Sequence, residues 1–192
     1  GLKNVGLEAM GALVNVRNNK VFVNLFDFAR RLDLRKIGKR PLEMLVQAGA
    51  FDVLDNNRHQ VFKSLDALVA YSAAIHDQKM SKQVSLFGDG GDDLPEPVLP
   101  SVSDWLPAER LSREFSAIGF YVTGHPLDDY KSAFKVNQIL TIEEVEEKAL
   151  SGPCLVKIAG VVVGRQERKS ARGNRFAFVQ LSDFTGNFEV TL

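Results

Sequence analysis

Residues 83–108 divide this chain, because their composition does not favour a folded core. They include three glycines, four prolines and five acidic residues, with no lysine or arginine. So few large apolar side chains cannot offset the entropy lost when such a backbone becomes ordered. We therefore predict a flexible acidic linker over residues 81–107. A chain of 192 residues interrupted in this way should contain more than one small domain.

The residues before the linker show the periodicity of helices. Apolar side chains recur at helical spacing in residues 7–19 and 57–80. Between these segments, Asn24 is a favourable helix N-cap, and Gly49 follows the end of a further helical pattern. We predict an all-helical domain over residues 1–80.

The pattern changes again after the linker. Residues 108–153 read as a helical connector, in which Thr141 and Glu144 have the spacing of a capping box. Residues 154–192 hold three runs of β-branched and aromatic residues separated by glycine-containing turns. We predict three antiparallel strands there. Three strands without closure would leave sheet edges open, so this domain is expected to be truncated.

Charge is distributed unevenly although the chain is neutral overall. The counts of basic and acidic residues give a net charge of +5 for residues 1–82, −8 for 83–153 and +3 for 154–192. Two basic ends around an acidic middle indicate two surfaces that face a polyanion. Ordinary scatter of charge is the alternative.

Several function classes find no support in the sequence. It has no Walker-type phosphate loop, no paired aspartates on a predicted strand and no Ser–His or Cys–His arrangement, so no catalytic residue is predicted. The single Cys154 and the scattered His59, His76 and His125 predict no metal site. His125, between a glycine and a proline, reads as a turn residue. No membrane-length apolar run or signal peptide is evident, which favours a cytoplasmic location.

Two glycine-containing turns are candidates for phosphate binding. Residues 1–6 ("GLKNVG") precede a helix, whose first N–H groups could bind a phosphate, and residues 48–51 ("AGAF") are a second candidate. Such a pair would hold both strands of a duplex through the backbone, independently of base sequence. The basic stretch 30–40 could follow a phosphate track. Simple connectors and a solvated basic face are the alternatives.

The last segment has the composition of a single-strand binder. Basic residues surround the turn of its first predicted hairpin, and phenylalanines lie on or near the strands, so that bases could stack while cations follow the backbone. These residues are Arg165, Arg168, Lys169, Arg172, Arg175 and, among the rings, Phe176, Phe178, Phe184 and Phe188. The segment resembles part of an oligonucleotide-binding (OB) barrel. The alternative is that most of these rings are core residues.

Taken in order, the motifs resemble the C-family replicative polymerases, the alpha subunits of bacterial DNA polymerase III. The matching segments are "GLKNVG", "FVNLFDFARRLD", "KRPLEMLVQAGAFD", "QVSLFG", "IGFYVTGHPLDDY" and "IAGVVVGRQERKSARGNRFAFVQLSDFTGNFEVTL". The resemblance implies a multidomain α+β fold: a tandem helix-hairpin-helix domain, a linker and a truncated OB barrel. The chain would be a C-terminal fragment without the palm carboxylates. The parent enzyme would extend primers by template-directed synthesis and use magnesium, while this fragment would hold no cofactor.

The resemblance also implies roles for particular residues. The duplex product would contact Lys3, Asn4, Val5, Gly6, Ala48, Gly49 and Ala50, with Arg35, Lys36, Lys39 and Arg40 nearby. Single-stranded template would contact Arg165, Arg168, Lys169, Arg172, Arg175 and Phe178. Further expected partners are the sliding clamp and other subunits of the replicase.

The clamp would bind a short peptide at residues 83–88. In this interpretation Gln83 hydrogen-bonds at the mouth of a pocket, Ser85 lies in the peptide, and Leu86 and Phe87 enter the pocket. Burying two such side chains contributes about 3–6 kcal/mol before ordering costs, which predicts a weak contact. Tethering of both partners to the same DNA would compensate by raising the effective concentration.

Two other interpretations of the sequence are possible. A DNA ligase- or nuclease-type accessory module also combines helix-hairpin-helix and OB domains, although no nucleotidylated lysine motif or metal-carboxylate motif is evident. A DNA-binding scaffold is the other, in which Leu86 and Phe87 form the last turn of the helix over 57–80 and pack on their own core.

Overall fold

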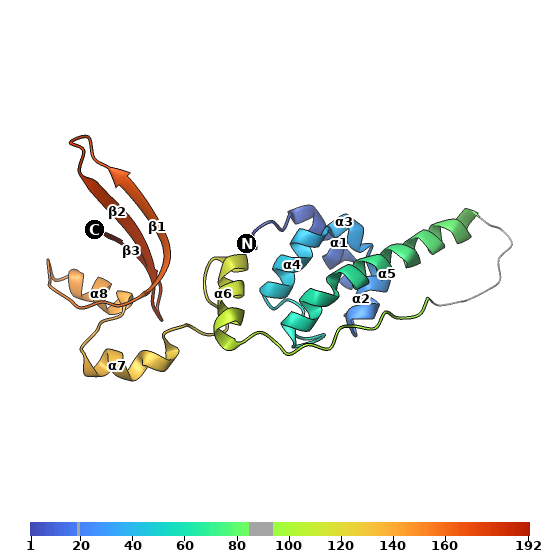
Figure 1. Ribbon diagram of the computed structural model, residues 1–192, viewed down its shortest axis with the longest axis horizontal. Coiled ribbons are helices and arrows are strands. Elements are labelled where there is room, and N and C mark those ends of the chain that lie inside the picture. Colours follow the sequence, from blue (N-terminus) through green and yellow to red (C-terminus); the bar gives the residue numbers. More distant parts are fainter. Residues whose placement is uncertain (19, 85–93) are drawn as a thin grey trace. The chain divides into compact units, whose positions relative to one another are not determined.

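The chain folds into two units, Gly1–Tyr121 and Val122–Leu192. The computed structural model describes residues 1–18, 20–84 and 94–192 (Figure 1). For residues 82–84, at the end of the second range, it describes the backbone but not the side chains. The first unit is helical, and the second carries an antiparallel sheet with short helices. The predicted α+β class is confirmed.

The helical unit is built around one long helix. Its elements are α1 (Leu7–Arg17), α2 (Leu25–Arg31), α3 (Leu34–Ile37), α4 (Lys39–Gln47), α5 (Arg58–Val84) and α6 (Pro107–Ile118). Helices α2, α3 and α4 pack along α5, and α6 packs on α4. Asn24 caps α2 as predicted, because its Oδ1 accepts a hydrogen bond of 2.8 Å from the N–H of Asp27.

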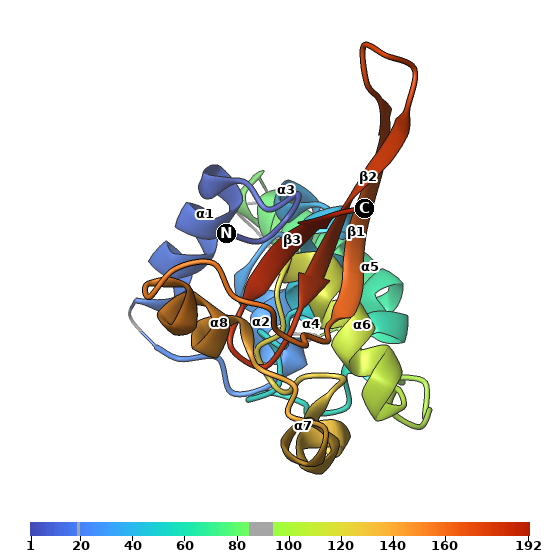
Figure 2. The same cartoon turned by 90° about the vertical axis from the view of Figure 1, so that its left-hand side faces the viewer.

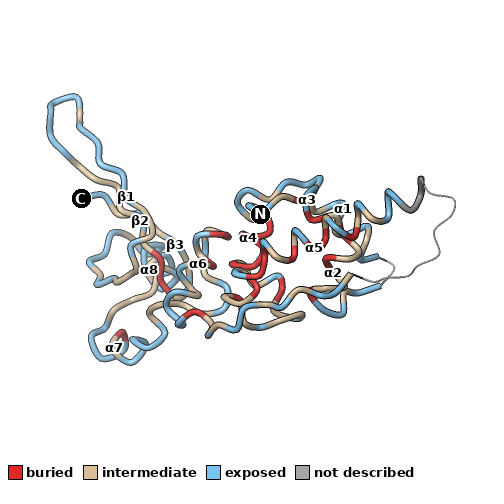
Figure 3. The backbone as a smooth tube through the Cα atoms, turned by 45° about the vertical axis from the view of Figure 1, so that its right-hand side comes forward, coloured by how far each residue is buried: buried red, intermediate tan, exposed pale blue. Residues whose placement is uncertain are grey.

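The core of this unit lies between α5 and the three helices packed on it, where buried positions gather (Figure 3). Four side chains are fully buried there: Leu34, Leu42, Val46 and Val61. Burial of each contributes about 1.5–3 kcal/mol to the free energy of folding. The hydroxyl of the buried Ser72 donates to the carbonyl of Leu32 at 2.6 Å and accepts from the N–H of Leu34 at 3.1 Å. This pair of bonds fixes the turn between α2 and α3 against α5.

Residues 94–106 pack on the helical unit in an extended strap, which corrects the prediction of a flexible linker for this part of 81–107. Leu94 and Leu99 pack against the core, and Trp105 is buried within it. The Asn57 side chain donates to the carbonyl of Val102 at 2.7 Å. Composition misled the prediction because the strap needs no core of its own: it adds apolar side chains to one already formed by the helices.

Trp105 is the main anchor of the strap. Its ring stacks on His59 and meets Phe62 edge-on, with centroid distances of 5.6 Å in each case. The guanidinium carbon of Arg113 lies 4.2 Å from the Trp105 ring centroid, a cation–π contact from α6. The strap is therefore held between the start of α5 and α6.

The predicted connector over 108–153 is divided by the structure. Helix α6 belongs to the helical unit, whereas the remainder of the segment belongs to the second unit, beginning at Val122. The physical reason is the contact between α6 and α4, which the helical periodicity of the sequence alone does not reveal.

We predict that Trp105→Ala lowers the free energy of unfolding of the helical unit by about 3–5 kcal/mol, the usual cost of removing a large buried aromatic ring. Urea unfolding followed by circular dichroism measures this, and limited proteolysis should then cut within 94–106. The neighbouring Leu106→Ala is the control, because that side chain is 74% exposed. Equal effects of the two substitutions would contradict the anchoring role.

The second unit contains the short helices η1 (Asp128–Tyr130), α7 (Lys131–Val136) and α8 (Ile142–Ala149), followed by strands β1 (Val161–Lys169), β2 (Arg175–Ser182) and β3 (Asn187–Thr191). The strands form an antiparallel sheet in the order β1-β2-β3. Thr191 of β3 pairs with Phe178, so the β1–β2 hairpin continues beyond β3 as a two-stranded ribbon (Figure 2). The three predicted antiparallel strands are confirmed.

The first strand begins later than the sequence predicts. The run of β-branched residues starts at Cys154, but β1 starts at Val161. Before it, only Ile158 forms an isolated parallel bridge, with Leu140, and Leu155 is 98% exposed. Residues 154–160 lack a continuous partner strand among the described residues, so their β propensity does not produce a ladder.

His125 and Asp183 join the helices of this unit to its sheet. The Asp183 carboxylate accepts from the N–H of Ile142, at the start of α8, at 2.6 Å and from the N–H of Thr185 at 2.8 Å. The Nε2 of His125 lies 3.2 Å from the Ser182 hydroxyl, and its Nδ1 accepts from the N–H of Leu127. Nδ1 therefore carries no proton in this arrangement, and His125 holds a turn as predicted.

We predict that this joint loosens in mild acid. Burial lowers the pKa of His125 below 6.5 and outweighs the nearby carboxylates of Asp128 and Asp183, which would raise it; the Lys131 charge acts in the same direction as burial. The unfolded state therefore binds a proton more readily, so stability is full above pH 6.5 and falls as the pH drops toward the folded pKa. Hydrogen exchange of 122–149, corrected for intrinsic rates, should show lower protection at the acidic end.

The matched variant for this test is His125→Asn, because the amide oxygen can still accept from Leu127 but does not titrate. The variant should lose the pH dependence of protection. A wild-type pH dependence retained in the variant would show that another group titrates.

Candidate nucleic-acid interface

The first hairpin presents unused backbone donors. Asn4 adopts the left-handed conformation, with φ 59°, in the turn that leads to α1. Gly6 caps the helix without a side-chain hydrogen bond, and the N–H groups of 7–9 have no acceptor among the described residues. The N–H of Lys3 donates to the carbonyl of Ala117 at 3.0 Å, which ties this turn to α6. The start of α1 can therefore donate to an anion.

A groove of about 590 Å³ connects this hairpin with part of the basic stretch. Gly6 and Ala9 line it from the start of α1, and Lys36, Ile37 and Pro41 line it from α3 and α4. Glu8 and Asp33 also face it, so its charge is mixed. The structure thus brings Gly6 and Lys36 together, which are 30 positions apart in the sequence.

The four predicted cations of this stretch fall into two pairs. Arg35 is bound to Asp33 and Asp77, each at 2.9 Å, and Lys39 lies 2.6 Å from Asp66. Lys36 and Arg40 are exposed and form no ion pair with any residue in the described part of the chain. A phosphate would therefore compete with carboxylates for the first pair but not for the second.

In the second hairpin, the three amides predicted to contact phosphate, those of Ala48, Gly49 and Ala50, are already engaged within the chain. Their N–H groups donate to the carbonyls of Met44, Val46 and Leu45 respectively, at 2.9, 3.0 and 2.9 Å. These bonds close the end of α4, with Gly49 at φ 81°. The glycine is needed for this turn and not for the approach of a phosphate.

The side chain that fills the second hairpin is Arg58. A Cβ on Gly49 would lie 2.1 Å from its Nη2, so the guanidinium occupies the space above the glycine. Arg58 is only 2% exposed; it donates to Asp52 at 2.8 Å, to Glu114 at 3.2 Å and to the carbonyl of Gln47 at 3.1 Å. Burial opposes the charged form, but these carboxylates outweigh it and raise the pKa of Arg58.

Arg110 extends the ion pairs to the strap. It donates to Asp52 at 3.1 Å and to Asp104 at 2.7 Å. Burial would raise the pKa of Asp104, yet the N–H groups of His59 and Trp105, together with Arg110, hold it below its usual value. We call the five residues Asp52, Arg58, Asp104, Arg110 and Glu114 the hairpin charge cluster.

Sequence reasoning missed this cluster. One signal was available: Arg58, Val61, Leu65 and Leu68 follow at spacings of three and four, so the arginine lies in register with the apolar stripe of α5. An arginine on a core-facing stripe indicates a buried ion pair.

The predicted single-strand residues lie on the β1–β2 hairpin. The strands are joined by a five-residue turn, 170–174, which contains Arg172 and in which Gly173 has φ 83°. Arg165, Arg168, Lys169 and Arg175 are all exposed on the strands. Phe176 and Phe178 meet edge-on at 5.4 Å, and the Arg168 guanidinium carbon lies 5.6 Å from the Phe178 centroid.

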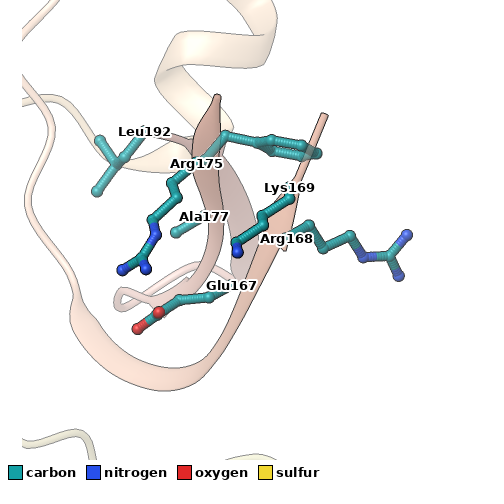
Figure 4. Close-up of a pocket in the computed structure, with 7 residues that line it drawn as sticks. Glu167, Arg168, Lys169, Arg175, Ala177 and Leu192 are labelled. Carbon is teal, nitrogen blue, oxygen red and sulfur yellow. The ribbon is translucent and has the colours of Figure 1, made fainter. Parts of the chain in front are cut away.

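One side of this hairpin forms a shallow pocket of about 580 Å³. Figure 4 shows Glu167, Lys169, Arg175 and Leu192 on this side, with Arg168 directed away from them. Phe184 and Phe188 are half-buried, and the Phe184 ring packs on Phe134 of α7 at 4.8 Å. The alternative interpretation, that these phenylalanines are core residues, therefore fits Phe184 better than it fits Phe176 and Phe178.

The predicted clamp peptide lies mostly outside the described residues. The backbone of Gln83 lies in the last turn of α5, and its side chain is outside the described residues, as are Ser85, Leu86 and Phe87. The clamp assignment therefore stays a prediction. Among the described residues, no His, Cys, Asp and Glu side chains cluster as metal ligands, and no helix is long and apolar enough to cross a membrane.

Comparison with known proteins adds to this geometry. Residues 1–61 match the family described as "Helix-hairpin-helix motif". The chain is 42% identical, over 98% of its length, to "DNA polymerase III subunit alpha" of Caulobacter vibrioides. The same subunits of Vibrio cholerae and Buchnera aphidicola are 32% and 30% identical over the whole chain. The chain spans only 16% of the Caulobacter relative and 17% of the other two.

The fold and these matches define a helix-hairpin-helix region followed by a small antiparallel-sheet unit. The chain is related, along its whole length, to the bacterial DNA polymerase III alpha subunits. The resemblance predicted from its motifs is confirmed.

Proposed function

We propose that this chain is a non-catalytic DNA- and clamp-binding region of a replicative DNA polymerase III alpha subunit. The observation that carries the proposal is the groove lined by both Lys36 and the start of α1, where the N–H groups of 7–9 have no acceptor among the described residues. Such a surface binds phosphates without contacting the bases. A polymerase needs this kind of binding, because it must hold a duplex product of any sequence.

The duplex would be held mainly through the first hairpin. Lys3 and Lys36 supply charge near the α1 donors, and Arg40 extends the basic surface along α4. The second hairpin would contribute less, since the amides of Ala48, Gly49 and Ala50 are engaged within the chain. This differs from a symmetrical pair of phosphate-binding hairpins.

Single-stranded template would bind the β1–β2 hairpin. Exposed cations and a pair of neighbouring phenylalanines are the combination that binds single strands with little sequence preference. The sheet would belong to an OB barrel in this proposal.

The sliding clamp would bind the peptide over residues 83–88, through Gln83, Leu86 and Phe87. The peptide begins in the last turn of α5 and precedes the strap, and this position supports the proposal because α5 and the strap both belong to the helical unit. Other replicase subunits are further proposed partners, and magnesium would act in the parent polymerase rather than in these residues. Replication would place the protein in the cytoplasm.

The competing ligase-type or scaffold role finds less support. The relatives cited above all bear the polymerase subunit name and match nearly the entire chain. A shared helix-hairpin-helix motif alone would have matched only the first third.

We predict that Lys36→Ala with Arg40→Ala weakens duplex binding and makes its salt dependence shallower. Each lost phosphate contact should reduce the log–log slope by about 0.9, and two contacts by about 1.8. Titration of the full chain with a duplex at several salt concentrations measures the slope. A flat salt response of the wild-type chain would contradict phosphate binding altogether.

The matched control is Arg35→Ala with Lys39→Ala, which removes the same charge from cations that are already ion-paired. The control should change the slope less than the test variant. Equal changes would show that overall charge matters and that the groove does not.

We further predict that Leu86→Ala with Phe87→Ala abolishes binding to the cognate clamp. The double variant would lose most of the free energy that burial of the two side chains contributes, about 3–6 kcal/mol. A weak contact would not survive a loss of that size. Calorimetry with the purified clamp measures the loss. Val98→Ala, at a side chain that is 95% exposed in the strap, is the control and should bind normally. Unchanged affinity of the double variant would refute the clamp assignment.

A further inference from the structure

Helix α1 presents the donors of the first hairpin, yet none of its 11 residues is buried. It rests on the core through a half-buried face that includes Ala9, Met10 and Leu13. Just before the helix, the N–H of Lys3 donates to the carbonyl of Ala117 at 3.0 Å, which ties down the hairpin end. A helix held in this way needs a second tie at its other end if its first N–H groups are to keep one direction.

The second tie is Arg31, in the last turn of α2. Its Nη2 donates to the carbonyl of Val16, in the last turn of α1, at 2.7 Å and to that of Lys20 at 2.6 Å. Its Nη1 donates to the carbonyl of Val21 and to the carboxylate of Asp27, each at 3.2 Å. The last carbonyls of a helix lack partners within it and form the negative end of its dipole, so a guanidinium stabilises this end of α1.

The Arg31 guanidinium has little capacity left for a phosphate, although it lines the same groove as Lys36. Its four acceptors match the four N–H groups of its two terminal nitrogens. Its carbon also lies 4.6 Å from the centroid of the Phe22 ring, and that ring meets the buried Phe28 edge-on at 5.1 Å. A phosphate could bind the terminal nitrogens only by displacing a carbonyl or a carboxylate.

The length of α1 turns a small change at Arg31 into a large one at the donors. A helix of 11 residues is about 16 Å long, at 1.5 Å for each residue. A tilt of about 10° at the Arg31 end would move the first N–H groups by about 3 Å, which is the length of a hydrogen bond. After such a shift the donors would no longer meet a phosphate that also contacts Lys36.

We infer that Arg31 is a positioning residue for duplex binding: it holds the end of α1 so that the N–H groups of 7–9 meet a phosphate in the groove. The inference rests on the proposed duplex-binding function and assigns to it a residue that acts through α1. It also gives a different role to one cation of the basic stretch 30–40, which the sequence places along a phosphate track.

The first test is Arg31→Lys in the full chain, because lysine keeps the positive charge but cannot reach four acceptors with one nitrogen. Hydrogen exchange of residues 7–17 should become faster, while exchange in α4 and α5 stays unchanged. Titration with a duplex should show affinity weakened by about 5- to 10-fold, the effect of losing about one hydrogen bond. The log–log salt slope should not change, because the charge is kept.

Arg30→Lys is the matched control, because it makes the same change at the preceding residue. The Arg30 guanidinium donates to Glu96 of the strap at 2.6 Å and to Tyr71 of α5 at 3.3 Å, and neither partner belongs to α1. This variant should leave the exchange of α1 and the duplex affinity unchanged.

The second test asks whether Arg31 acts through the donors of α1. Leu7→Pro removes the N–H of the first helical residue, where proline is well accommodated, and Gly6 already has the extended conformation, φ −78° and ψ 152°, that suits a following proline. Leu7→Ala keeps the N–H and is the control, since this side chain is 93% exposed. Leu7→Pro should weaken duplex binding by about 2- to 10-fold. Combined with Arg31→Lys, the loss should be smaller than the product of the two separate losses, because both changes affect one contact.

The outcomes separate the inference from the proposed function. If the wild-type chain does not bind a duplex, both fail. If it binds, but Arg31→Lys has wild-type α1 exchange and wild-type affinity, the positioning role is wrong and the duplex-binding function stands. Faster α1 exchange with normal affinity, exchange that rises equally in α4 and α5, or fully multiplicative losses in the combined variant would each overturn the positioning role as well.

Discussion

The buried Arg58 guanidinium is the interaction on which the helical unit most depends. It joins the loop after α4, the start of α5 and the middle of α6 through Asp52, Glu114 and the carbonyl of Gln47. Removing one partner from such a buried pair typically costs about 3–5 kcal/mol, because the other charge is left uncompensated. The hairpin charge cluster thus defines one arrangement of the second hairpin, α6 and the strap.

This cluster also explains why the two hairpins differ. In the second hairpin, the arginine and the helix-ending bonds use the space and the amides that a phosphate would need. In the first, the start of α1 keeps its donors, and α6 supports the turn through the carbonyl of Ala117. One hairpin therefore supports the structure while the other is available for a ligand.

The sequence predicted the features that depend on local physics. Asn24 caps α2, Thr141 and Glu144 form the capping box of α8, and three antiparallel strands follow. Prediction from the sequence failed where contacts between segments far apart in the chain determine the structure. The strap looks disordered by composition but is fixed by Trp105, and the segment at Cys154 looks like a strand but finds no continuous partner. Similarly, the sequence "AGAF" gives no sign that the Arg58 guanidinium lies against Gly49 or that the amides of Ala48, Gly49 and Ala50 are engaged within the chain.

The distribution of charge on the surface is another feature that the sequence alone does not predict. The net charge of +5 over residues 1–82 suggests a broadly basic surface. The structure pairs Arg35 with two aspartates and Lys39 with a third, which leaves Lys36 and Arg40 exposed without a carboxylate in the described chain. On the β1–β2 hairpin the opposite holds, because its register sets like charges against each other. A polyanion is attracted by the cations that folding leaves unpaired, so the pairing pattern, rather than the count of basic residues, determines where nucleic acid can bind.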